Sequence, residues 1–390
     1  MKKTMHLPGK PGWLLCIVLL PCFATAEAFS GDPPDAHHPW AVHDVNRPQP
    51  PRVQPASRPG DPPSDAIVLF DGSQASLANW RHEKPKEERK RDWFVEDGAL
   101  VCAPGAGYLL TREAFGDCQL HIEWSAPAAH GGSGQGRSNS GVFLMGIVEV
   151  QVLDNFNNPT YADGTAGAVY GVMPPAANAL RAPGQWQSYD IIFRRPVVRH
   201  GQVLDPGSLT VLCNGVVLQD STPLEGGGGW KKRQPLDRAF PDRASLKLQD
   251  HGNPVRFRNI WIRPLRPRAL DGGFDGRLDP HATARKRAAI AAEIRLDAAT
   301  KSGLPQALRL YESLVYAPDA PALETADALT VEFLNACAQA PQDELKLRKG
   351  DFLLLQRALK YLEDHQLLPG EPLPLPRVES VIEEQGWKKQ

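Results

Sequence analysis

The sequence predicts a mainly β fold, a two-sheet sandwich, followed by a small α-helical region. From Ala66 to about Arg268, apolar and polar residues alternate in many short runs, which is the period of half-buried strands. Asp97-Gly98 and Asn214-Gly215 are typical hairpin turns between such runs. No helical period interrupts the strands, and about 200 residues in one such unit favour a large sandwich.

The N-terminus resembles a secretory signal. Lys2 and Lys3 precede a short apolar run over residues 13–20, which is too short to span a bilayer. Ala24-Thr25-Ala26 is a typical cleavage site, so we expect residues 1–26 to be removed as a signal peptide. The mature chain would then be periplasmic or extracellular, without a membrane span. Lipoprotein anchoring through Cys22 is a less favoured alternative, because Pro21 fits such a signal poorly.

Residues 27–64 are dense in proline and show no apolar periodicity, which predicts a disordered linker rather than a domain. His37, His38 and His43 lie in this stretch. Solvated linker histidines are far more common than metal ligands in such a context.

The sandwich is expected over residues 65–268. Its strands are predicted at residues 67–70, 93–101, 119–124, 139–144, 148–154, 187–194, 208–213, 216–219, 245–249 and 257–263. Two loops are rich in glycine and could either connect strands or border a cleft: residues 130–138, and the run 226–229, which Trp230 and Lys231 follow.

Residues 269–390 are predicted to be helical. Apolar residues recur at helical spacing in four stretches, with Asp351 as a candidate N-cap for the last: 281–298, 304–315, 325–338 and 351–365. We see no catalytic motif there. This region could dock a partner protein, form an oligomer or act as a lid.

Composition excludes some classes of function. Lys and Arg number 44 against 45 Asp and Glu, so no basic footprint for nucleic acid or anionic membranes is present. After signal removal four cysteines remain, at positions 102, 118, 213 and 337. Cys102 and Cys118 could pair in an oxidising compartment, and buried free thiols are at least as consistent with their apolar surroundings. No C-x-x-C spacing suggests a metal site.

The strand over residues 148–154 carries the first candidate site. Val148, Val150 and Val152 share one face, and Glu149 and Gln151 share the other. A carboxylate and an amide on one surface suit a ligand, although an ordinary solvated face has the same pattern.

A second candidate lies in Leu248-Gln249-Asp250-His251-Gly252. Alternation places Gln249 and His251 on one face, and a histidine at a strand end is suited to proton transfer. The alternative is a histidine that fixes a turn. Tyr170, Trp186 and Tyr189 are candidate sugar-stacking platforms, although single aromatic residues are more often part of the core.

Seven motifs in one order together resemble the 3-keto-disaccharide hydrolase family, formerly a domain of unknown function, over about residues 66–266. They are Asn139-Ser140-Gly141-Val142-Phe143, Glu149-Val150-Gln151-Val152-Leu153-Asp154, Gly167-Ala168-Val169-Tyr170-Gly171, Trp186, Asn214-Gly215, Leu248-Gln249-Asp250-His251-Gly252 and Phe257-Arg258-Asn259-Ile260. The resemblance implies a concanavalin A-like jelly roll with a concave, sugar-binding sheet. One departure is Gln187, where the family usually has Asn.

A second comparison concerns Glu149-x-Gln151-x-x-Asp154, which is similar to the Glu-x-Asp-x-x-Glu strand of laminarinase-type endo-β-glucanases. Retaining hydrolysis needs two carboxyl groups about 5–5.5 Å apart, and Asp154 is one methylene shorter than the glutamate of that family. Ordinary retaining hydrolysis is therefore disfavoured.

Cleavage of a 3-keto-glycoside, as the first resemblance implies, needs only one base and one group near the keto oxygen. We therefore expect Glu149 or His251 to take the C2 proton, with Asp154 as the third catalytic candidate. Binding candidates are Asn139, Gln151, Tyr170, Trp186, Gln249 and Arg258. A divalent metal, if used, would be held by Glu149, Asp154 or His251. The alternatives are a non-catalytic carbohydrate-binding module and a laminarinase-like glucanase.

Overall fold

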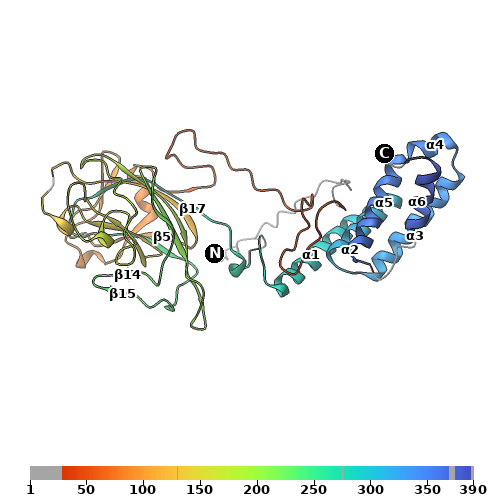
Figure 1. Cartoon of the computed structure of the whole chain (residues 1–390). Helices are drawn as coiled ribbons and strands as arrows, with labels where there is room; N and C mark the ends of the chain where they lie inside the picture. The colour runs from red at the N-terminus through yellow and green to blue at the C-terminus, as the bar shows by residue number, and fades with distance from the viewer. Residues whose placement is uncertain (1–28, 130, 274–275, 369–373, 388–390) are drawn as a thin grey trace, which may run out of the picture. The chain divides into compact units, whose positions relative to one another are not determined.

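The computed structural model describes residues 29–129, 131–273, 276–368 and 374–387 (Figure 1). The predicted signal peptide, with Cys16 and Cys22, lies outside these residues. The described residues form two compact units. One lies within Pro51–Gly273, and the other combines the described residues of Met1–Pro50 with those of Phe274–Gln390.

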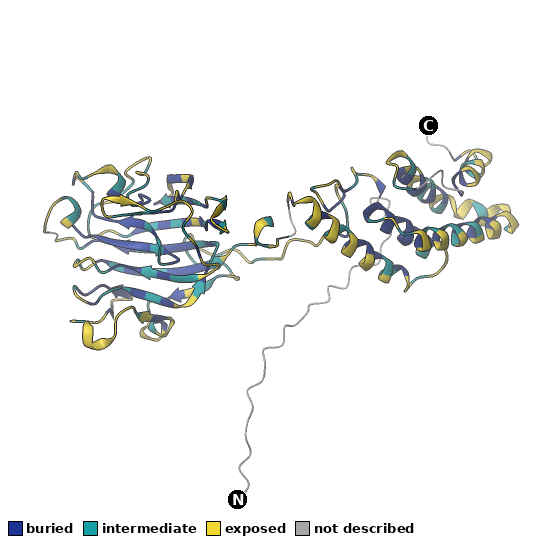
Figure 2. Ribbon diagram, turned by 90° about the horizontal axis from the view of Figure 1, so that it is seen from below, coloured by how far each residue is buried: buried dark blue, intermediate teal, exposed yellow. Residues whose placement is uncertain are grey.

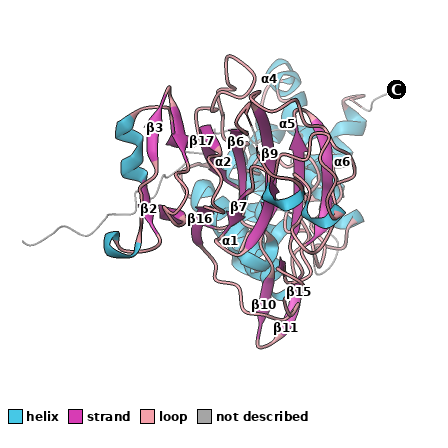
Figure 3. Cartoon of the chain, turned by 90° about the vertical axis from the view of Figure 1, so that its left-hand side faces the viewer, coloured by secondary structure: helices cyan, strands magenta, loops and turns pink. Residues whose placement is uncertain are grey.

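The first unit is an antiparallel sandwich, which confirms the predicted fold class. Figure 3 shows its two layers, with β2, β16 and β7 in one and β3, β17, β6 and β9 in the other. The larger sheet has the order β13-β12-β9-β6-β17-β4-β3, with β1 also paired to β17, and the smaller has the order β2-β5-β16-β7-β8.

The strand bounds are as follows. The larger sheet contains β1 (Ile67–Phe70), β3 (Phe94–Glu96), β4 (Ala99–Val101), β6 (Cys118–Ser125), β9 (Gln187–Arg194), β12 (Ser208–Cys213), β13 (Val216–Pro223) and β17 (Arg256–Pro264). The smaller contains β2 (Trp80–His82), β5 (Leu109–Phe115), β7 (Ser140–Leu144), β8 (Val148–Val152) and β16 (Ala244–Leu248). Two short hairpins are β10 (Val197–Arg199) with β11 (Gln202–Asp205), and β14 (Gly228–Gly229) with β15 (Lys232–Arg233).

The core of the sandwich lies between the two sheets, where the inward faces of the strands are buried (Figure 2). Tyr189 on β9 is fully buried there and packs edge-on against Trp124 at 5.6 Å. Its hydroxyl donates a 2.8 Å hydrogen bond to the backbone oxygen of Gln151 on β8, which ties one sheet to the other. Tyr189 is therefore a core residue, and its prediction as a sugar platform is wrong.

The two predicted hairpin turns are confirmed. Asp97 and Gly98 join β3 to β4 with φ of 49° and 70°, and Asn214 and Gly215 join β12 to β13 with φ of 52° and 83°. Such turns need left-handed backbone at both positions, which Asn, Asp and Gly tolerate best. The four described cysteines are buried and free, so Cys102 and Cys118 do not form a disulfide.

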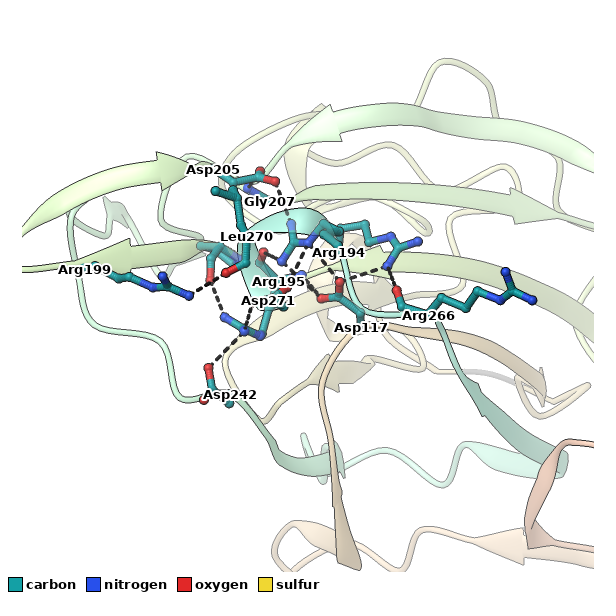
Figure 4. Close-up of polar contacts among 12 residues, drawn as sticks. Asp117, Arg194, Arg195, Arg199, Asp205, Gly207, Asp242, Arg266, Leu270 and Asp271 are labelled. Atoms are coloured by element: carbon teal, nitrogen blue, oxygen red, sulfur yellow. Dashed lines mark hydrogen bonds and ion pairs between the residues drawn. The ribbon is translucent and has the colours of Figure 1, made fainter. Parts of the chain in front are cut away.

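An arginine–aspartate network holds the segment that follows β17 (Figure 4). Arg268 contacts Asp117 at 3.1 Å and Asp205 at 2.7 Å, and Arg194 contacts Asp117 at 3.0 Å. Arg195, with 9% of its side chain exposed, pairs with Asp271 and Asp242. Ion pairs that form a network and are partly buried contribute more to stability than single pairs on the surface. The network fixes where the chain leaves the sandwich.

The proline-rich stretch differs from the expected disordered linker. Gly60 accepts hydrogen bonds from the indole of Trp261 at 2.9 Å and from the amide of Asn259 at 2.8 Å, so this part lies on the outer face of the larger sheet. Further upstream, Phe29 and Trp40 are buried with the helical core. Proline removes backbone pairing and periodicity, yet isolated apolar side chains and carbonyl groups can still pack.

The second unit contains six helices within its described residues: α1 (Pro280–Ala298), α2 (Gly303–Tyr316), α3 (Ala320–Gln339), α4 (Gln342–Leu347), α5 (Lys349–Asp364) and α6 (Leu375–Glu384). The four predicted helices correspond to α1, α2, α3 and α5. Asp351 lies in the first turn of α5 and is not its cap, because that helix begins after Arg348. None of the described helices combines the length and apolar character that crossing a membrane requires.

Candidate functional site

The site is built on the outer face of the smaller sheet, where β8 carries Glu149 and Gln151. Val148, Val150 and Val152 are fully buried in the core, so alternation turns the two polar side chains to the opposite face. Glu149 is paired across the ladder with Phe143 of β7, which in turn is paired with Lys247 of β16.

The carboxylate of Glu149 lies across Gly141 of the neighbouring strand. A Cβ at position 141 would be 2.2 Å from Oε1 of Glu149 and 2.9 Å from the ring of Phe143, so only glycine leaves the room. Among the described residues, no hydrogen bond or ion pair to this carboxylate is found. Burial raises the pKa of Glu149 to about 8, and the charge of Lys247 opposes that rise only in part.

Lys247 lies close enough to this carboxylate to affect its pKa, and it also contacts two aromatic rings. Its ammonium group lies 4.7 Å from the centre of the Tyr108 ring and 4.9 Å from that of Phe143. A loose ion pair of 3.7 Å joins it to Glu83. The two rings hold the cation over the face of the sheet through cation–π attraction.

A cluster of side-chain amides completes the floor of the site. The amide of Gln151 donates to Asn139 and to Gln135, at 3.3 Å in both cases, and Asn139 donates to Gln135 at 3.2 Å. Gln249 follows β16, and its Oε1 atom is buried without a hydrogen-bond partner. Unpaired buried amides are costly, so this oxygen is suited to accept a hydrogen bond from a hydroxyl group of a ligand.

A pocket of about 410 Å³ has Tyr161 and Tyr170 in its lining, and Tyr170 is the residue that connects it to Glu149. The backbone N–H of Tyr170 donates to the carbonyl of Glu149 at 3.1 Å, and its hydroxyl pairs with that of Tyr161 at 3.0 Å. Burial, this hydrogen bond and the nearby charge of Glu149 together raise the pKa of Tyr170. The glycine run supplies the far wall. Gly228 is needed there because a Cβ at this position would be 1.8 Å from the backbone carbonyl oxygen of Tyr170. The loop over 226–229 therefore borders a cleft.

Asp154 and His251 are not joined to Glu149. Asp154 is 2% exposed and forms a 3.0 Å ion pair with Arg137. His251 is exposed in the turn after β16, while its neighbour Asp250 turns back to accept from the N–H groups of Gly105 and Gly107. Within the described ranges, no cluster of three or more His, Cys, Asp and Glu side chains could hold a metal ion. The predicted metal set is thus not assembled.

Trp186 and Arg258 lie on the opposite side of the sandwich. Arg258 is on the outer face of the larger sheet, where it pairs with Glu123 at 2.6 Å and covers the ring of Trp186 at 4.1 Å. The interpretation of these two residues as part of the Glu149 site is therefore wrong. Gln187 is buried and accepts hydrogen bonds from the Arg181 N–H and the Asn214 amide, which gives it a structural role.

Sequence reasoning missed three residues of the site: Gln135, Tyr161 and Lys247. Lys247 could have been found, because it is two residues before Gln249 on one strand and so shares its face. Gln135 and Tyr161 come from loops whose path no periodicity predicts.

Comparisons with known proteins agree with this architecture. A family described as 3-keto-alpha-glucoside-1,2-lyase-like domains matches residues 65–263. A Bacteroides thetaiotaomicron protein named 3-keto-disaccharide hydrolase is 24% identical over 246 residues, which are 51% of this chain and 78% of that protein. A crystal structure from Parabacteroides distasonis, described as a candidate glycosyl hydrolase, is 41% identical with a TM-score of 0.52 and covers 56% of this chain and 93% of its own. The chain therefore belongs to the family of 3-keto-alpha-glucoside-1,2-lyase-like domains.

Proposed function

We propose that this chain is an exported enzyme that cleaves 3-keto-glycosides. The observation that carries the proposal is Glu149, a mostly buried carboxyl group without a hydrogen-bond partner among the described residues. A general base works best when its pKa is close to the working pH, and the pKa of Glu149 is about 8, near neutral pH. The names of the relatives that match this chain support the same class of substrate.

The proposed reaction begins with the proton on C2, which the ketone at C3 acidifies. Ionised Glu149 takes this proton, and the electron pair of the C–H bond moves toward the keto oxygen. The ammonium of Lys247, whose strand partner Phe143 is also the partner of Glu149, lies on the same face of the sheet and would stabilise the negative charge.

The enolate then collapses. Its electrons form the C1–C2 double bond, the bond from C1 to the leaving oxygen breaks, and the protonated Glu149 returns a proton to that oxygen. Addition of water across the new double bond completes a net hydrolysis. This route uses one carboxylate, which fits a site where Asp154 is bound to Arg137 rather than aimed at the same face.

The test compares native and C3-oxidised phenyl glucosides as substrates of the mature chain. We expect cleavage of the oxidised compound only, and a kcat/KM that rises with pH to a plateau above about 8, because the base must be ionised. Glu149→Gln should lower this rate by about 10²–10⁴-fold, whereas His251→Ala, a change in an exposed turn, serves as the matched variant.

Wild-type rates in Glu149→Gln would refute the role of Glu149. A loss confined to His251→Ala would transfer the base to the histidine. If the protein retained the sugar on a column and released no phenol, it would be a carbohydrate-binding module, an outcome for which the exposed Tyr161 and Trp230 provide a suitable surface.

A further inference from the structure

Three consecutive cations contribute to the wall of the pocket that Tyr170 connects to Glu149. Lys231, Lys232 and Arg233 line it from the β14–β15 hairpin. No ion pair involves any of the three among the described residues, although Asp163 is also on the wall. A pocket wall with three cations of one sign has a positive potential that favours an anionic ligand.

The hairpin is held in place by its contact with Tyr170. Gly228 and Gly229 pack against the Tyr170 and Gly171 backbone so closely that no side chain would fit at Gly228. Lys231, at the tip, has a φ of 56° and its ammonium lies 5.1 Å from the ring of Trp230. The cations are thus presented by a built turn and not by a loose end of the chain.

An aromatic surface accompanies the positive charge. Trp230 is 62% exposed, and its ring lies 6.2 Å from that of Tyr161, which in turn contacts Tyr170 at 6.4 Å. Large exposed aromatic groups beside a pocket favour stacking with a flat ligand. The pocket therefore offers a stacking surface and a cationic wall together.

The position of the pocket determines which part of a substrate would enter it. If the reacting ring lies over Glu149, as the proposed function requires, the substituent on C1 is the part that extends away from it. We propose that the pocket binds the leaving group of the glycoside, and that this leaving group is aromatic or planar and carries a negative charge such as a carboxylate. This inference rests on the proposed function.

The experiment uses two 3-keto-glucosides with nearly equal leaving-group chemistry, 4-carboxyphenyl and 4-carbamoylphenyl. Their dissociation constants are measured by calorimetry with the full chain carrying Glu149→Gln, in which turnover is slowed, and their kcat/KM values with the wild type. We expect the carboxylate compound to bind about tenfold more tightly, or ~1.4 kcal/mol. The preference should shrink as salt rises from about 0.05 to 0.5 M, because exposed charges are screened.

A triple variant, Lys231→Gln with Lys232→Gln and Arg233→Gln, should bring the ratio of the two constants close to one. Its matched control neutralises Lys86, Lys90 and Arg91, three exposed cations in the loop after β2, at the other edge of the smaller sheet. The ratio is taken within each protein, so a general loss of binding cancels.

Equal binding of the two compounds, or a preference that survives the triple variant, would overturn the inference. Because binding is measured separately from turnover, the preference can be found even if neither compound is cleaved, in which case only the proposed function fails.

Discussion

Replacing Glu149 with glutamine should stabilise the protein, and increasingly so as the pH rises. The native pKa of about 8 exceeds the ordinary value of 4.5, so the folded state binds the proton more tightly than the unfolded chain does. Between these two pH values the unfolded chain loses its proton first, and the stability of the wild type therefore falls. Above about pH 8 the loss of wild-type stability is complete. Converting the difference between the two pKa values into free energy gives at most about 5 kcal/mol for this loss.

The assay is urea unfolding of the wild type and of Glu149→Gln at pH 5, 7 and 9, followed by tryptophan fluorescence. The helical unit is unchanged in the variant, so the difference between the two proteins reports on the sandwich. We expect a small difference at pH 5 and a gain of several kcal/mol at pH 9. Glu96→Gln, at an exposed glutamate on β3, should give the same small difference at each pH. Parallel pH dependences for the wild type and Glu149→Gln would refute this account of the buried carboxyl group.

Two further predictions concern its neighbours. Gly141→Ala places a methyl group 2.2 Å from the Glu149 carboxylate, so we expect kcat/KM on 3-keto-glycosides to fall about 10²-fold. Gly350→Ala, in α5 with open space around its Cβ, is the control, and equal rates in both variants would contradict the reasoning. Asp154→Asn leaves Arg137 buried without its carboxylate and should cost about 3–5 kcal/mol of stability, measured by urea unfolding. If the stability of Asp154→Asn were unchanged and its kcat were lost, Asp154 would be a catalytic residue instead.

The strands could be predicted closely because period-two alternation is a local property of the chain. β9 and β12 have the predicted bounds, Gln187–Arg194 and Ser208–Cys213, and the turn that follows β12 was marked by Asn214-Gly215. The helical region was predicted less completely. α4 has six residues and exposes Leu347 at its end, so it shows little helical period, and α6 follows a proline-rich stretch.

The site was predicted in part, because alternation gives the face of a strand but not the sheet to which the strand belongs. Glu149 and Gln151 were placed correctly on one surface. Arg258 was not, because β17 joins the other sheet and its register shifts between Arg258 and Trp261. The ion pair of Asp154 could not be predicted either, since its partner Arg137 comes from an irregular loop.

The core and the site depend on a single register. The valines of β8 are in the core because Glu149 and Gln151 are on the opposite face, and a slip of one residue would turn both polar groups into the apolar core and remove all three valines from it. Tyr189 adds to this constraint, because its hydroxyl reaches across the core to the Gln151 carbonyl. The position of the Glu149 carboxylate is therefore set by the packing of fully buried apolar residues. Such a group is held in place before the substrate binds, which is the arrangement that efficient proton transfer requires.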